Sequence, residues 1–505
     1  MKKHFGLVFL TAAIICGQAW AQAPDTAWVR AYNGPAGGDD QGIGCTIDDS
    51  GHLYVSGTSS NGSDYDFLTI KYDAATGDTL WTRRYNGPAN GMDCGMRCAV
   101  DGEGNLYVSG YSLHGAPYDS SDYLTIKYNP AGDTVWARTY NSPANDADFG
   151  YGCAVDAAGY CYVAGASYFG NGTADYVTVK YDATTGDTLW TRRYNGPANG
   201  SDKAFDCSVD GSGNVYVCGY SFNGTDYNLL TVKYNPDGDT VWTRRSADAT
   251  DSANMDYAMA GCAVDGSGNV YITGECGPRT GNRYSVTIKY NASGTPLWTG
   301  IYDGPSMMDG TIDCAVNGPG DRLYVTGSTY RGPHDHYLTV CYDASIGDTL
   351  WSRSYLSSDD RTEYSIGCAV DGDGNLYVSG VSLDTLTWIG DYQTIKYNTA
   401  TGVAGEPAER TAWQTVKLLP NRPNPFSQHT TINYQLAGTG RVSLAVYNIA
   451  GQKVKTLADG PQNAGTHSMR WDGRDEKGNR VCAGVYFSCL LVGVQQATSK
   501  ITIVR

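Results

Sequence analysis

The chain has 505 residues, a formal net charge of −16, 64 Gly and 39 Tyr. An acidic surface repels phosphate backbones and anionic lipid headgroups, so the composition argues against nucleic acid and anionic membranes as partners. No apolar run beyond the N-terminus is long enough to cross a bilayer, so we expect no transmembrane segment.

Residues 1–21 have the pattern of a secretory signal peptide. Lys2 and Lys3 precede an apolar run over residues 5–16, and Ala19-Trp20-Ala21 offers a cleavage site with small residues. We therefore expect a protein that is secreted or carried on the outer cell surface.

A repeat begins next and occupies about three quarters of the chain. A Trp recurs every 52 to 56 residues, at Trp28, Trp81, Trp136, Trp190, Trp242, Trp298 and Trp351. A Cys follows each Trp by 16 to 20 residues, and by 17 in five of the seven units, at Cys45, Cys98, Cys153, Cys207, Cys262, Cys314 and Cys368. A fixed period of this size indicates a stack or ring of identical supersecondary units.

One unit consists of four strands joined by tight turns. Residues 98–140 contain CAVD, NLYVSG, YLTIKY and TVWARTY, which are rich in β-branched and aromatic residues and lack helical periodicity. Gly and Asn occupy the intervening turns, where a positive φ is needed. Four antiparallel strands of this kind make one propeller blade. Lys on the third strand of six units predicts structural ion pairs with a neighbouring blade.

The two ends of the repeat region are complementary. The seventh unit has three strands and ends at Tyr397, whereas residues 25–28 supply a Trp strand without the three strands before it. Pairing these pieces leaves no strand edge exposed. The sequence therefore predicts an all-β protein, with a seven-bladed β-propeller over residues 22–398 that the N-terminal strand closes.

The repeat cysteines are predicted to be buried, unpaired thiols. Each occupies one equivalent position per blade, and packed sheets lie about 10 Å apart. A disulfide needs Cα atoms within about 7 Å. Cys482 and Cys489, near the C-terminus, could be paired or free.

Beyond a linker at 399–414, residues 415–505 have a different sequence pattern and lack the repeat. Alternating strands such as 431–436, 442–447 and 485–490 are separated by turns, which predicts an Ig-like β-sandwich.

Both parts resemble known families. The repeat YNGPANGSDKAFDCSVDGSGNVYVCGYS resembles the bacterial β-propeller repeat called SBBP, which implies an exported propeller and no particular reaction. Pro423-Asn424-Pro425-Phe426, Trp471-Asp472-Gly473 and Gly484-Val485-Tyr486-Phe487 resemble the Ig-like domain of flagellar hook-capping proteins and the sorting domain of type IX secretion cargo. The second resemblance implies recognition by a secretion machinery and attachment or release at the surface.

An acid precedes every repeat Cys by five or six residues. The series is Asp40, Asp93, Asp148, Asp202, Asp256, Asp309 and Glu363. In a closed ring these carboxylates would gather on one face near the channel mouth. They could cap their own loops or form inter-blade ion pairs, or they could bind a ligand rich in hydroxyl groups or a cation such as calcium, the one cofactor that the sequence suggests.

No catalytic motif is present: the chain lacks G-x-S-x-G, H-E-x-x-H and a P-loop. His334-Asp335-His336 is an isolated cluster without further metal ligands nearby in the sequence. The sequence therefore predicts a non-enzymatic binding or surface-scaffold protein whose partner is an extracellular protein or glycan. The alternative is a hydrolase or lyase acting on an extracellular polymer, with its site in the propeller channel.

Overall fold

The computed structural model divides the chain into two compact units, Met1–Ala408 and Glu409–Arg505. It describes residues 24–113, 121–170, 172–246, 259–276, 283–304, 309–332, 334–358, 361–399, 417–419, 421–436, 440–448, 453–463, 465–492 and 495–504. The expected signal peptide, all but the first residue of the expected linker and Asp256 lie outside these residues. Every regular element in the described ranges is a β-strand, so none of them contains a helix that could span a membrane.

The first unit, here called the repeat domain, contains seven four-stranded antiparallel sheets within its described residues. The first strands are β2 (Asp40–Ile47), β6 (Asp93–Val100), β10 (Asp148–Val155), β14 (Asp202–Val209), β18 (Ala260–Val264), β22 (Asp309–Val316) and β26 (Arg361–Val370). The second strands are β3 (His52–Ser60), β7 (Leu106–Leu113), β11 (Tyr160–Tyr168), β15 (Val215–Phe222), β19 (Val270–Cys276), β23 (Arg322–Arg331) and β27 (Leu376–Asp384).

The other half of each sheet is formed by the third and fourth strands. The third strands are β4 (Tyr65–Asp73), β8 (Ser121–Tyr128), β12 (Ala174–Asp182), β16 (Tyr227–Tyr234), β20 (Tyr284–Tyr290), β24 (His334–Asp343) and β28 (Gly390–Asn398). The fourth strands are β5 (Thr79–Tyr85), β9 (Thr134–Tyr140), β13 (Thr188–Tyr194), β17 (Thr240–Arg245), β21 (Pro296–Tyr302), β25 (Thr349–Tyr355) and, from the N-terminus, β1 (Asp25–Tyr32).

The N-terminal strand pairs with the last strand of the repeat domain. β1 is antiparallel to β28, with Asp25 opposite Asn398 and Val29 opposite Ile395, and the sheet order is β1-β28-β27-β26. The predicted pairing of the two ends is therefore observed.

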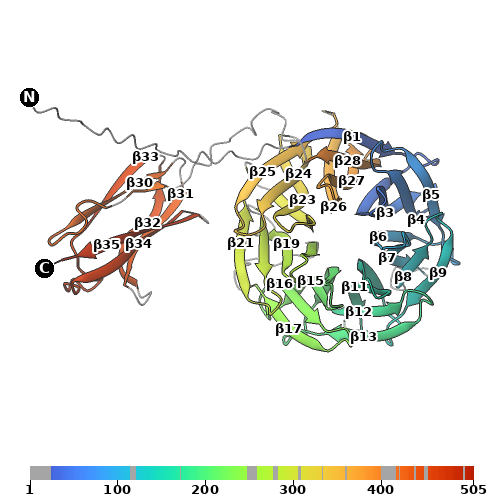
Figure 1. The fold of residues 1–505 in the computed structure, drawn as a ribbon, viewed down its shortest axis with the longest axis horizontal. Helices are drawn as coiled ribbons and strands as arrows, with labels where there is room; N and C mark the ends of the chain where they lie inside the picture. The colour runs from blue at the N-terminus through green and yellow to red at the C-terminus, as the bar shows by residue number, and fades with distance from the viewer. Residues whose placement is uncertain are drawn as a thin grey trace, which may run out of the picture. The chain divides into compact units, whose positions relative to one another are not determined.

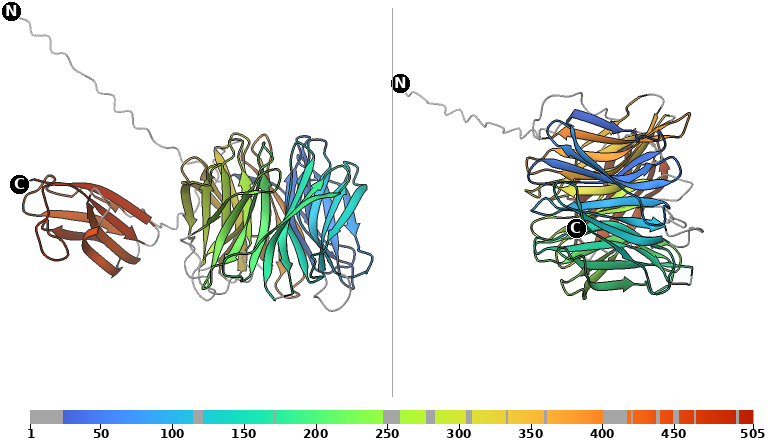
Figure 2. Two further views of the ribbon diagram at one scale, coloured as in Figure 1. Left: turned by 90° about the horizontal axis from the view of Figure 1, so that it is seen from below. Right: turned by 90° about the vertical axis from the view of Figure 1, so that its right-hand side faces the viewer.

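The seven sheets are arranged around a common centre, with the first strands innermost and the Trp strands at the periphery (Figure 1). Each first strand contacts the first strand of the next sheet, and β26 contacts β2. Figure 2 shows the strands of this domain running between two faces at which the turns gather.

The core of the repeat domain lies between the sheets. One buried cluster joins Tyr54 and Phe67 of one sheet to Leu106, Val108 and other apolar residues of the next. The thiol of Cys98 points across this boundary and lies 3.9 Å from the carbonyl oxygen of Tyr54. All seven repeat cysteines are buried free thiols, as predicted.

The C-terminal domain has two sheets, of order β29-β30-β33 and β32-β31-β34-β35. Its strands are β29 (Lys417–Leu418), β30 (Thr430–Leu436), β31 (Gly440–Asn448), β32 (Lys453–Gln462), β33 (Gly465–Trp471), β34 (Gly484–Val492) and β35 (Gln495–Ile503). One buried cluster takes Ile432 and Trp471 from the first sheet and Val442, Leu490 and Ile501 from the second. This is the arrangement of a β-sandwich.

The motifs that carry the family resemblance are structural in this sandwich. The Phe426 ring packs at 5.7 Å on Trp471, and the Phe426 N–H donates to Thr502 on the last strand. The amide of Asn424 exchanges hydrogen bonds with Lys500 and Thr502. The motif thus fixes the entry of the chain against β35.

Candidate functional site

Six of the seven acids predicted to line a ligand site lie in the described residues, and each is fully buried where the chain enters an innermost strand. Asp40, Asp93, Asp148, Asp202, Asp309 and Glu363 all have 0% exposure. A carboxylate oxygen of Asp40 accepts the N–H of Gly34 at 2.6 Å, and Asp148 does the same for Ser142. Equivalent bonds join Asp93 to Gly87, Asp202 to Gly196 and Glu363 to Ser357.

These contacts are those of the loop-capping alternative. A side chain at Gly34 would lie 3.0 Å from the Asp40 carboxylate, so glycine allows the loop to close over the acid. Burial raises the pKa of Asp40, Asp202 and Glu363 and raises that of Asp148 to about 6. The acids are brought to equivalent positions in different sheets, each inside its own loop, and their role toward a ligand remains a prediction.

A second repeated arrangement holds neighbouring sheets together at the periphery. We call it the rim latch: the Trp of a fourth strand and the Lys of a third strand both donate to one turn carbonyl of the next sheet. Trp136 Nε1 and Lys127 Nζ reach the Ala183 carbonyl oxygen at 3.1 and 2.8 Å. At five other boundaries the equivalent Trp and Lys also share one carbonyl, that of Ala74, Pro130, Pro236, Ala292 or Ala344.

The rim latch corrects the predicted role of the repeat lysines. Their closest acceptor is a backbone carbonyl, and each ammonium also lies over a Tyr ring, as Lys127 does over Tyr107 at 5.1 Å. The ion pair between Lys233 and Asp210 spans 3.8 Å, longer than the Lys233 bond to Ala292. The lysines therefore serve structure, as expected, but chiefly through hydrogen bonds.

The centre of the repeat domain contains charged residues that the sequence analysis missed. Arg97 of β6 pairs with Asp313 of β22 at 2.5 Å, although these strands belong to well-separated sheets. Asp206 of β14 accepts the N–H groups of Cys207 and Cys262, each at 2.9 Å. We call Arg97, Asp206 and Asp313 the axial cluster.

The axial cluster is nearly sealed from solvent. Arg97, Asp206 and Asp313 are 9%, 6% and 5% exposed. Burial raises the pKa of Asp206 to about 7, and the nearby Asp313 charge adds to this while Arg97 opposes it. Burial alone would lower the pKa of Arg97, but the two carboxylates raise it, so the guanidinium stays charged.

Glycines on alternate first strands make room for the axial cluster. A side chain at Gly44 would lie 2.8 Å from the Arg97 Cα, and one at Gly261 would lie 2.5 Å from the Asp313 Cα. Arg97 lies within the register shift between Gly95 and Cys98, and a shift directly precedes Asp206 and Asp313; such bulges redirect side chains.

A signal for this cluster was present in the sequence. The residue before the repeat Cys is Gly44, Arg97, Gly152, Asp206, Gly261, Asp313 or Gly367. At this repeat position, four units have glycine and three have a charged residue. Because the position lies on the innermost strand, the charged residues indicate a contact between first strands of different sheets.

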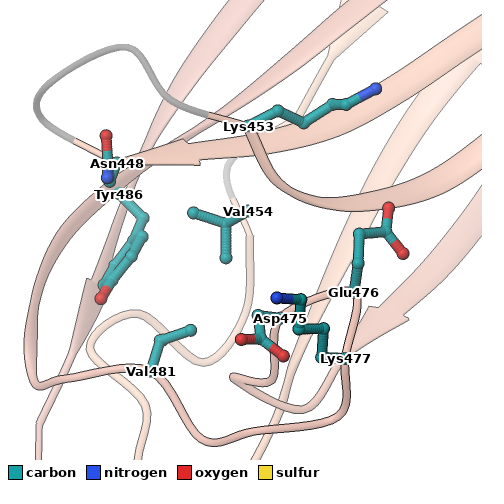
Figure 3. A pocket seen from close by; sticks show the side chains of 8 residues that line it. All are labelled: Asn448, Lys453, Val454, Asp475, Glu476, Lys477, Val481 and Tyr486. Carbon is teal, nitrogen blue, oxygen red and sulfur yellow. The ribbon is translucent and has the colours of Figure 1, made fainter.

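A cavity of about 410 Å³ opens at one end of the C-terminal sandwich (Figure 3). Val454, Val481 and Tyr486 form its apolar side, while Lys453 and Lys477 bring positive charge. Glu476, also in its lining, accepts the Thr456 N–H at 2.6 Å, and so is already engaged in the fold. Within the described parts of both domains, no group of three or more His, Cys, Asp or Glu is placed to hold a metal ion.

Part of the C-terminal domain is similar to a known protein family. Residues 426–488 match the family model of the FlgD Ig-like domain. No match is found among curated proteins. The similarity of the repeats to the SBBP family stays a prediction.

Three solved structures are similar at low identity. One is PorZ, a surface component of the type IX secretion system of Porphyromonas gingivalis (15% identity, TM-score 0.41, 94% of this chain and 61% of that one). Another is the polysaccharide lyase Uly1 (12% identity, TM-score 0.46, 77% of this chain and 94% of that one), and a third is a protein of unknown function from Dyadobacter fermentans (10%, 0.44, 74% and 99%). The chain thus spans about three fifths of the PorZ length.

Proposed function

We propose that this chain is an exported, non-enzymatic binding protein of the outer cell surface. In this proposal, residues 22–398 form a closed seven-bladed propeller that serves as an interaction platform for an extracellular protein or glycan. Residues 415–505 act as a sorting domain toward a secretion machinery. The shared rim latch supports closure, because Trp28 and Lys396 donate to Ala74 in the same way as their counterparts at other boundaries.

The observation that carries the non-enzymatic proposal is the sealed axial cluster. The alternative, a hydrolase or lyase, requires an acid or base in the channel that a polymer can reach. Asp206 is 6% exposed and bonded to two backbone N–H groups, and Asp313 is held by Arg97. A sugar chain cannot approach carboxylates that are buried in this way.

The test is incubation of purified residues 24–505 with neutral and acidic extracellular polysaccharides. We expect binding on a glycan or peptide array and no release of reducing or unsaturated ends. Cleavage that disappears in Asp206→Asn would contradict the proposal and establish the enzyme alternative.

The sorting role needs a separate experiment. A reporter that carries residues 1–21 and 415–505 should reach the surface of a host with type IX secretion, whereas the same reporter without residues 415–505 should stay in the periplasm. Equal periplasmic retention of both reporters would show that the C-terminal domain does not direct export.

A further inference from the structure

The turn between β27 and β28 exposes two large apolar side chains. Leu386 is 86% and Trp388 is 69% exposed, the highest values for large hydrophobic residues in the part of the chain that the structure describes. Single half-exposed residues such as Leu80, at 49%, are ordinary on a protein surface, whereas Leu386 and Trp388 are more exposed and lie two residues apart in one turn, which makes this turn a candidate interaction site. We call residues 384–389 the Trp388 turn.

The backbone of the Trp388 turn does not require a tryptophan. Trp388 has a φ of 59°, in the left-handed region that bulky residues avoid. The turn after β4 has the same hydrogen bonds, with the Gly77 N–H on the Asp73 carbonyl as the Trp388 N–H is on Asp384. Gly77 has a φ of 75°, so the equivalent position in that turn is occupied by glycine, the residue that suits a left-handed backbone.

Hydrogen bonds hold the Trp388 turn in one conformation. The N–H groups of Leu386 and Thr387 both donate to the Asp384 carboxylate at 2.9 Å. The Gly390 N–H, directly after the turn, donates to Asp39 of the next sheet at 2.9 Å. The Trp388 side chain is therefore attached to a rigid turn, and this rigidity lowers the entropic cost of binding.

We propose that the Trp388 turn binds a neutral glycan chain by stacking a sugar ring on the Trp388 indole. The C–H face of a sugar ring is apolar and slightly positive, which complements the negative face of an aromatic ring. Thr387 and Asp384 belong to the same turn, and their hydroxyl and carboxylate groups suit sugar hydroxyl groups. This inference rests on the proposed role as a binding platform and names its ligand class.

Charge and size favour a neutral glycan over the other occupants. Backbone hydrogen bonds from Thr387 and Leu386 lower the pKa of Asp384, which stays ionised, and the whole chain carries −16, so an acidic polymer is repelled. Two exposed side chains are also far short of the roughly 1,200 Å² that a stable protein interface buries.

The test is calorimetric titration of residues 24–505 with cellohexaose, laminarihexaose and mannohexaose, and with tetragalacturonate as the acidic comparison. We expect a neutral hexasaccharide to bind, and Trp388→Gly to weaken that binding by about tenfold or more, because a large apolar contact is lost. Leu80→Ala is the matched control, since it removes an exposed apolar residue elsewhere and should leave the affinity unchanged.

Thermal unfolding distinguishes a binding role from a structural one. Glycine fits a left-handed position, so Trp388→Gly should keep the Tm of the parent protein or raise it by about 1–3 °C. A structural Trp388 would instead show a lowered Tm together with any loss of affinity, and that result would overturn the inference.

The remaining outcomes are equally decisive. Equal glycan affinity in Trp388→Gly overturns the inference and leaves the platform proposal intact. Binding to tetragalacturonate alone, or to neutral phosphatidylcholine vesicles without any hexasaccharide, assigns the turn to another ligand. A parent protein that binds nothing on glycan or peptide arrays overturns the platform proposal as well.

Discussion

The rim latch and the axial cluster join the same sheets by opposite means. At the rim, each of six boundaries uses an equivalent Trp and an equivalent Lys that donate to one shared carbonyl, and where a carboxylate is near, as Asp210 is to Lys233, it lies farther away than that carbonyl. At the centre, single charged residues from β6, β14 and β22 meet once, and glycines on the strands between them give space. Repetition thus suffices at the periphery, whereas the centre depends on particular residues that the repeat does not contain.

The boundary between β25 and the last sheet is where the rim pattern has to change. No hairpin turn links β28 to β1, because these strands come from opposite ends of the chain. Arg353 donates instead to the Pro24 carbonyl and, at 3.2 Å, to the Thr26 hydroxyl. The N-terminal segment therefore replaces the missing turn.

Removal of β1 should have the largest effect. Deleting residues 24–34 exposes the edge of β28 and removes the Trp28 bond to Ala74, so we expect aggregation or a fall in Tm of more than about 10 °C. Calorimetry and size-exclusion chromatography measure this, and adding the peptide 24–34 should restore part of the loss. An unchanged Tm would mean that the pairing contributes little.

Next in size is the loss of the axial guanidinium. Arg97→Met leaves Asp206 and Asp313 buried without their cation, and we expect a loss of about 3–5 kcal/mol in the free energy of unfolding. Arg97→Met combined with Asp313→Asn is the control, because it removes one charge and keeps an acceptor for the Cys368 N–H. If both variants are equally unstable, lost packing rather than unpaired charge is the cause.

The pH dependence of stability should follow Asp206. The pKa of this carboxyl is 3.8 in the unfolded chain and about 7 in the folded protein, because the folded protein buries it, so between these values the folded protein holds a proton that the unfolded chain has released. Stability is therefore greatest at low pH in this window and falls as pH rises, by about 2–5 °C in Tm between pH 5 and pH 8.

Asp206→Asn should reduce this decline without abolishing it, because Asp148, with a pKa of about 6, titrates in the same direction. Melting curves across pH for both proteins provide the comparison. A Tm that rises with pH in the parent protein would show that Asp206 is ionised throughout.

A single rim latch should matter least. Trp136→Phe removes one donor to Ala183 while Lys127 keeps that carbonyl satisfied, so we expect a loss of about 1 kcal/mol. Trp242→Phe should cost the same amount and add to it, because the two boundaries are distant. Unequal or cooperative losses would show that the latches are not equivalent.

The sequence predicted those features that repeat or that complete a repeat. Strand order within a unit followed from β-rich runs and Gly-containing turns, and the β1–β28 pairing followed from a Trp strand at one end and its absence at the other. Burial of Cys98 and its equivalents followed from spacing alone. In each case the deciding information is the repeat pattern itself, either within one unit or at the point where the pattern is interrupted.

Features that depend on several units could not be derived in this way. The Arg97–Asp313 pair joins strands whose approach depends on how all the sheets are arranged. Lys127 was expected to contact a carboxylate, but it donates to a backbone carbonyl in a turn of the next sheet. Every residue has a backbone carbonyl, so the sequence does not indicate which one will accept a hydrogen bond from a side chain. Trp388 lies in a turn between a second and a third strand, whereas Gly77 lies in a turn between a third and a fourth strand. The two turns have the same hydrogen bonds, but an alignment of the repeats does not bring them to the same position.

The pairing of β1 with β28 also determines when the domain can finish folding. The partner of the first strand is made last, so contacts of high sequence separation must wait for the whole repeat region, and such topologies fold slowly. A chain that crosses a membrane N-terminus first would carry an unpaired, aggregation-prone β1 until Asn398 has emerged. The final sheet can therefore form only after the chain has been made as far as Asn398.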